Sequence, residues 1–135
     1  ARHREYAELM DALGAAASRA ASALEAALLD ALIAELTLQR ELLARLGSAA
    51  NVPIITPEVR ELAEWASPRA AAVLPSGAGG GDIVLWVAHE PSPPDFRELA
   101  HRLGHRHIPL ELHARGVFCF DRDCFPREKG ALRGS

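Results

Sequence analysis

The sequence predicts an α+β domain in which helices cover one face of an antiparallel sheet. Apolar residues recur at three- and four-residue steps from Tyr6 to Leu46, which is the spacing of amphipathic helices. After residue 70 come short apolar runs of the kind that form strands, with one more helical pattern between them. A chain of 135 residues fits a single domain, which we place at residues 1–126, followed by a flexible tail at 127–135.

The first part of the domain is expected to be a helical hairpin over residues 4–46. A pattern of about forty residues is too long for one globular helix. We therefore expect two antiparallel helices, at about 4–23 and 27–46. Gly47 is expected to end the second, because glycine readily adopts the left-handed conformation found at helix C-termini. The alanine-rich stretch 12–34 suits close helix packing, within the hairpin as the favoured case and across a homodimer as the alternative.

An α/β layer is expected to follow at residues 52–121. Its first helix begins with Thr56, a natural N-cap, and Pro57, which suits a first helical position because the N–H there has no helical partner. A later helix has Ser92 as its expected cap. The four runs expected to form strands are residues 70–75, 82–88, 108–114 and 116–120. The first two are expected to be buried.

Charge and composition exclude several classes of protein. The net charge is −3, and the 15 basic and 18 acidic residues are interspersed, so no basic stripe points to nucleic acid. Charged residues interrupt the apolar stretches well short of the ~20 residues that a membrane helix needs, and no secretory signal pattern is seen. The two cysteines make no disulfide framework, so we expect a cytoplasmic protein. Because the chain begins in helical register, we expect it to be part of something larger.

One stretch, LPSGAGGGDIVLWVA at residues 74–88, sets four glycines within five residues between two strand-forming runs. Each glycine costs roughly 0.5–1 kcal/mol relative to alanine in regular structure. The backbone is therefore expected to pass very close to something. The lysine of a P-loop is missing, and no helix follows the glycines as a dinucleotide-binding loop requires.

What fits these glycines is a strand–loop–strand unit. Its N–H groups can converge on an anion, with Ser76 as a further donor and Asp82 orienting a donor or a metal-bound water. A plain flexible hairpin loop is the alternative. If the loop binds anions, Gly79→Val and Gly80→Val are both expected to abolish phosphate binding while leaving the fold mostly intact.

The same residues resemble a family motif. LPSGAGGGD resembles the third conserved motif of the GHMP kinases, and its nearest variant is the KPSGAGGGD of the bacterial-type phosphomevalonate kinases in that family. The upstream run LLARLGSAANVPIITPEVRELAEWA resembles the same group, so the resemblance spans roughly residues 25–120. It implies a ferredoxin-like C-terminal kinase half whose glycine loop contacts the substrate phosphate. The positions that match this loop are Ser76, Gly77, Ala78, Gly79, Gly80, Gly81 and Asp82.

The resemblance also implies a reaction and its partners. The reaction is transfer of the γ-phosphoryl group of ATP, with Mg²⁺, to a small phosphorylated substrate, 5-phosphomevalonate in the favoured case. The ATP loop of the family is missing from this chain, so we expect no catalytic residue in it. An N-terminal kinase half, on the same or another polypeptide, would complete the site. Leu74 stands where the family has lysine. Mevalonate kinase, or a stand-alone anion-binding or regulatory module without catalysis, are the alternatives.

Other residues that could form sites are expected to be structural. His101 and His105 lie one helical turn apart, but they suit a basic helix end better than a metal site. The two cysteines are too few for a metal clip, so no metal site is expected. Trp65 and Trp86 are expected to fill a helix–sheet interface.

Overall fold

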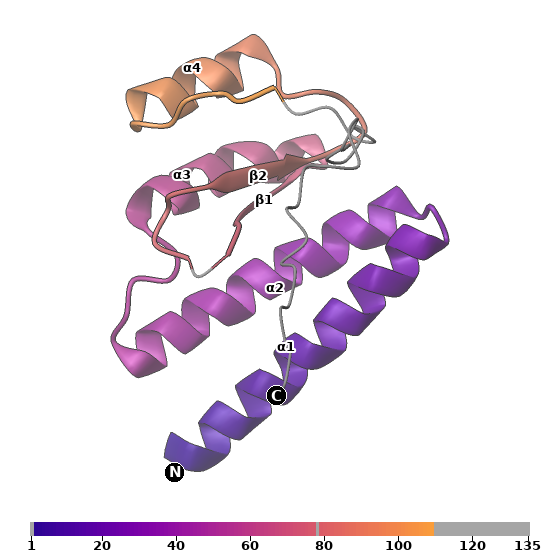
Figure 1. Ribbon diagram of the computed structural model, residues 1–135, viewed down its shortest axis with the longest axis vertical. Helices are drawn as coiled ribbons and strands as arrows, with labels where there is room; N and C mark the ends of the chain where they lie inside the picture. The colour runs from indigo at the N-terminus through magenta and orange to yellow at the C-terminus, as the bar shows by residue number, and fades with distance from the viewer. Residues whose placement is uncertain (1, 78, 110–135) are drawn as a thin grey trace, which may run out of the picture.

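The computed structural model describes residues 2–77 and 79–109, which form an α+β fold, as the sequence predicts (Figure 1). The elements in chain order are α1 (Arg2–Glu25), α2 (Leu29–Ala50), α3 (Pro57–Ala66), the short 3-10 helix η1 (Ser67–Arg69), β1 (Ala72–Pro75), β2 (Val84–Val87) and α4 (Pro94–Arg102). Ile108 and Pro109 have no regular structure. The rest of the two later predicted strands, and the predicted tail at 127–135, lie outside the described residues.

The predicted helical hairpin is confirmed: α1 extends beyond both of its expected ends, whereas α2 begins two residues later and ends four residues later than expected. α1 and α2 run antiparallel and pack through a small cluster of Leu9, Ala16 and Leu42 (Figure 1). Across one flank of this contact, the guanidinium of Arg19 donates two hydrogen bonds, of 2.7 and 2.9 Å, to the carboxylate of Glu35. Small side chains on α1 let the two backbones approach, which agrees with the prediction of packing within the hairpin.

Three helices end with the same hydrogen-bond pattern. Beyond α1, α2 and α4, the residues Ala27, Asn51 and Gly104 have φ of 55°, 55° and 89°, and the N–H of the next residue reaches back five positions to a helix carbonyl. This is the Schellman motif, which satisfies carbonyls left over at a helix end. The prediction that Gly47 ends the second helix is wrong, because the helix continues to Ala50.

Gly47 has a different role from the predicted one. A Cβ at this position would lie 2.6 Å from the carbonyl oxygen of Val52, so the glycine lets the chain fold back tightly on α2. The segment held in this way, residues 52–56, leads directly into α3. It is also the segment against which the glycine-rich loop packs.

Of the N-caps predicted for the two short helices, the first is confirmed and the second is wrong. The hydroxyl of Thr56 accepts a hydrogen bond from the N–H of Val59 at 3.4 Å, so the predicted N-cap of α3 is confirmed, with Pro57 at the first helical position. α4 begins at Pro94, and its N-cap is Pro93 rather than the predicted Ser92. Consecutive prolines put the extended backbone of the N-cap one residue later than the serine rule expects.

The two strands form an antiparallel pair in which Ala72 faces Val87 and Pro75 faces Val84. All four residues of β1 are buried, whereas β2 is only half-buried, so the prediction that both strands are buried holds for β1 alone. α3 and α2 both contact β1. Side chains alternate along a strand, so the complete burial of β1 means that helices reach both of its faces, not one face as predicted.

The main core lies between α3, α4 and the sheet. Its buried members are Leu62, Ala63, Ala66, Ala71, Val73, Phe96 and Leu99. Trp65 and Trp86 pack against this cluster, as predicted, and both contact Phe96, with ring centroids 5.5 and 4.4 Å from it. Aromatic pairs at such separations and tilts stabilise a helix–sheet interface beyond simple burial. The core thus holds β1, β2 and α3 in fixed relative positions, and the glycine-rich loop joins two of these elements.

Candidate glycine-loop site

The glycine-rich loop connects β1 to β2 and contains every residue that the sequence points to as a phosphate site. The N–H of Ser76 donates to the carbonyl of Ile83 at 2.9 Å, which closes the hairpin at the base of the loop. Between these residues the glycines at 77, 79, 80 and 81 have φ between 80° and 88°. Only glycine adopts such values at little cost, so the backbone path itself requires them. Ala78 lies outside the described residues.

Two of the glycines, Gly79 and Gly81, face the chain itself, and we call them the inner glycines. A Cβ at Gly79 would lie 2.9 Å from both the carbonyl oxygen and the Cγ2 of Ile54. A Cβ at Gly81 would lie 3.2 Å from the hydroxyl of Thr56. The close approach that the sequence predicts therefore exists, but at these positions it is to the segment that precedes α3.

The other two, Gly77 and Gly80, face outwards, and we call them the outer glycines. A Cβ at either position would meet no atom of the described residues within 4 Å. Both residues are exposed. Residues 2–77 and 79–109 thus leave this side of the loop open, next to a backbone that only glycine can follow.

The N–H donors of the loop divide differently from the inner and outer glycines. The N–H of Gly80 donates to the carbonyl of Ile54 at 3.1 Å, and the N–H of Ser76 is held by Ile83, so neither is free for a ligand. Toward the described residues, the N–H groups of Gly77, Gly79, Gly81 and Asp82 donate no hydrogen bond. These groups, with the exposed hydroxyl of Ser76, are the donors that an anion could reach.

The loop lies against the N-terminus of α3, because Gly81 packs on the N-cap Thr56. A helix N-terminus carries a partial positive charge that favours anions. Here a carboxylate of the chain already uses it. The pKa of Glu58 is lowered, first by a hydrogen bond from its own N–H, then by one from the Thr56 hydroxyl and by the charge of His105. Glu58 was not among the predicted site residues, and the signal that could have identified it is an acidic residue in the first turn of a helix.

The structure bears on two of the expectations about the loop, one at Leu74 and one at Gly79. Leu74, which replaces the lysine of the resembling family, is in β1 opposite Leu85 and is buried. The position therefore gives the loop no exposed counter-charge. Gly79→Val can no longer be expected to leave the fold intact, because Gly79 touches the backbone of Ile54. Gly80→Val would meet no described atom, but the φ of 81° strains a β-branched side chain, so this variant is also expected to cost stability.

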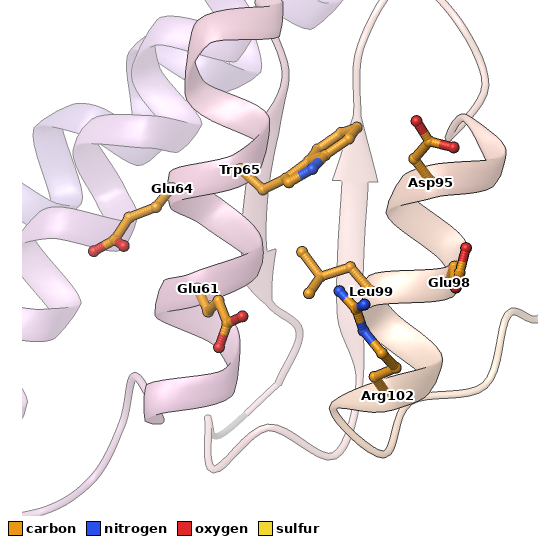
Figure 2. Close-up of a pocket in the computed structure, with 7 residues that line it drawn as sticks. All are labelled: Glu61, Glu64, Trp65, Asp95, Glu98, Leu99 and Arg102. Atoms are coloured by element: carbon orange, nitrogen blue, oxygen red, sulfur yellow. The ribbon is translucent and has the colours of Figure 1, made fainter.

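The described residues also contain an open groove between α3 and α4, of about 530 Å³ (Figure 2). Leu99 points from α4 toward α3, and Trp65 lies beside it (Figure 2). The charged residues that line the groove are Glu61, Glu64, Asp95, Glu98 and Arg102. The four carboxylates outnumber the one guanidinium, so the groove as a whole repels a phosphate. It is therefore a poor site for the anionic ligand that the glycine loop suits.

Metal and membrane features were sought over the same residues. Within residues 2–77 and 79–109, no three histidine, cysteine, aspartate or glutamate side chains gather as metal ligands. His101 lies near the end of α4, whereas the two cysteines lie outside the described part of the chain. None of the described helices is both long and apolar enough to cross a bilayer.

Comparison of the chain with protein-family models, with curated proteins and with solved structures finds no significant match.

Proposed function

We propose that the glycine-rich loop is the substrate-phosphate loop of a GHMP-type small-molecule kinase, and that this chain is its C-terminal half. The observation that carries the proposal is the outer side of the loop. Among the described residues, nothing lies within 4 Å of a Cβ placed at Gly77 or Gly80, and N–H donors without a partner there lie in the same few residues, beside the N-terminus of α3. Backbone donors held in place by a rigid sheet and helix can bind a phosphoryl oxygen without reorganising.

The reaction proposed is transfer of the γ-phosphoryl group of ATP to a phosphorylated small alcohol, with 5-phosphomevalonate as the favoured substrate. Phosphoryl transfer depends mainly on positioning and on neutralising charge. The loop would supply the positioning, by holding the phosphate of the acceptor. ATP and Mg²⁺ would be held by the N-terminal half, because the ATP loop of the resembling family has no counterpart in this sequence.

The second candidate is an anion-binding module that acts without catalysis. The observation in its favour is the buried Leu74, since a lysine at an exposed position would have supplied a counter-charge for two polyphosphates. The carboxylate of Glu58 points the same way, because a negative charge at the N-terminus of α3, beside the loop, would oppose a highly charged ligand. Both candidates use the same loop and differ in whether a kinase half completes it.

Titration calorimetry of the chain with inorganic phosphate, mevalonate and 5-phosphomevalonate tests the proposal. The kinase assignment predicts that 5-phosphomevalonate binds at least about tenfold more tightly than either of the other two, a difference of about 1.4 kcal/mol. Equal affinity for phosphate and 5-phosphomevalonate would support the anion-binding module. Absence of binding by all three would contradict both.

A further inference from the structure

Four elements bring one of their ends to the glycine-rich loop. The loop joins the end of β1 to the start of β2, and α3 begins beside it, because Gly81 packs on Thr56. α4 follows β2 in the chain and runs back along the sheet, so its C-terminal end also lies at the loop (Figure 1). Figure 2 shows α3 and α4 side by side, with Asp95 at one end of the groove and Arg102 at the other, where α3 begins. The chain that leaves α4 therefore enters the surroundings of the proposed phosphate site.

The segment at the end of α4 is basic and has a defined path. Five of the seven residues at 101–107 are histidine or arginine, namely His101, Arg102, His105, Arg106 and His107. Gly104 has a φ of 89°, and the N–H of His105 donates to the carbonyl of Ala100 at 2.9 Å, which fixes the turn after the helix. His105 is half-buried, whereas the other four basic residues are exposed. The turn thus holds His105 at the loop end of the sheet.

His105 lies close enough to Glu58, at the N-terminus of α3, for its charge to act on that carboxylate. The pKa of Glu58 is lowered first by a hydrogen bond from its own N–H, then by one from the Thr56 hydroxyl, and also by the charge of His105. Of the histidines at 101, 105 and 107, His105 is the one with this effect. Glu58 is in the first turn of the helix on which the loop packs. A protonated His105 therefore offsets the negative charge that opposes an anion at the loop.

We propose that His105 supplies the positive charge of the phosphate site, and that its protonation raises the affinity of the glycine-rich loop for tetrahedral dianions as the pH falls. The inference rests on the proposed function, because it assigns a further residue to the same loop. Leu74, where the resembling family has lysine, is buried in β1 and cannot supply this charge. Histidine is the side chain type that changes its charge between pH 5 and 8, so a site that depends on one responds to pH in that range.

The other charged groups of this region set the sign of the pH dependence. α3 and the loop contribute Glu58, Arg60, Glu61 and Asp82, and α4 with the segment after it contributes His101, Arg102, Arg106 and His107. Arginine stays protonated and carboxylates stay ionised between about pH 5.5 and about pH 8.5, so the histidines account for any change of charge. Protonation adds positive charge, so an anion should bind more tightly at the lower pH.

Calorimetric titration of the full chain with sodium sulfate tests the inference, because sulfate keeps its charge over this pH range whereas a phosphate ester does not. The wild-type chain is expected to bind sulfate about fivefold more tightly at about pH 5.5 than at about pH 8.5. His105→Gln should bind as weakly at both pH values as the wild-type chain does at the higher one. His105→Arg keeps the positive charge throughout and should bind tightly at both.

His101→Gln is the matched control, because it makes the same change at an exposed position one helical turn earlier. It should keep the wild-type pH profile. A wild-type pH profile in His105→Gln would overturn the inference, and so would an equal loss in His101→Gln, because net charge would then explain the effect. Either result, with sulfate still bound, would leave the loop assignment intact. Absence of sulfate binding at both pH values would overturn the inference and contradict the phosphate loop as well.

Discussion

The inner and outer glycines of one loop have similar backbone conformations but different surroundings. Gly79 and Gly80 are adjacent, with φ of 88° and 81°. At Gly79 a Cβ would run into Ile54, whereas at Gly80 it would meet no described atom within 4 Å. One glycine therefore serves the packing of the chain on itself, and its neighbour keeps a space open. A glycine-rich motif can combine a structural and a binding requirement, and substitution can separate them.

The largest expected effect comes from alanine at the inner position. Gly79→Ala adds both the strain of a left-handed alanine and a contact of 2.9 Å with backbone, and we expect a loss of about 3 kcal/mol in the free energy of unfolding. Gly80→Ala carries the same strain without the contact and should cost about 1 kcal/mol. Urea denaturation of the two variants measures the difference. Equal losses would show that the inner and outer positions are not distinct.

The order of the two variants should reverse when ligand affinity is measured under conditions in which both are folded, with Gly80→Ala affected more than Gly79→Ala. Gly80→Ala places a methyl group where we propose that the phosphate lies, so the affinity for 5-phosphomevalonate should fall about tenfold or more, which is about 1.4 kcal/mol. Calorimetry at a temperature at which the variant is folded measures this change. Unaltered affinity would mean that the ligand does not bind at the outer side of the loop.

A smaller effect is expected at the helix against which the loop packs. Thr56→Ala removes the N-cap of α3 and should lower the free energy of unfolding by about 1 kcal/mol. Thr56→Ser keeps the hydroxyl and is the control, with most of the stability retained. Thermal melting of the two variants compares them. If they melt together, the methyl group that packs near Gly81 matters more than the cap.

Glu58→Gln tests the charge beside the loop. The substitution removes a negative charge from the N-terminus of α3, so phosphate affinity should rise by a small factor, about two- to fivefold. Glu64→Gln is the matched control, at an exposed residue of the same helix that lies farther from its N-terminus. It should change the phosphate affinity little. A fall in affinity for Glu58→Gln would mean that this carboxylate helps to organise the loop rather than competing with its ligand.

The smallest effect is the dependence of stability on pH. The pKa of Glu58 is lowered by its own N–H, and that of Glu35 by the hydrogen bonds from Arg19. A carboxyl whose pKa is lowered by folding stabilises the fold above its unfolded pKa of about 4.3, and this stabilisation is lost as the pH falls toward the lowered value. Stability should therefore decline on acidification below about pH 5, and Glu35→Gln should make the decline shallower. An identical profile for this variant would contradict the role of the Arg19–Glu35 pair.

The sequence predicted the α+β class, the hairpin and the cap at Thr56, because helix spacing and capping are local patterns. It failed at Gly47, whose role depends on the return of Val52 onto α2, and at the end of α2, where Asn51 takes the left-handed position. It located the glycine-rich loop but not the surface that the loop approaches. A contact between Gly79 and Ile54 joins residues 25 positions apart, and no local pattern contains it.

Amide NMR spectra of the chain, titrated with inorganic phosphate and then with 5-phosphomevalonate, test the central claim most directly. We expect the largest shifts at the amides that donate to no described residue, those of Gly77, Gly79, Gly81 and Asp82. Ser76 and Gly80, whose N–H groups are held by Ile83 and Ile54, should shift less. Shifts confined to other parts of the chain, or no shift at saturating ligand, would contradict the assignment of the loop as a phosphate site.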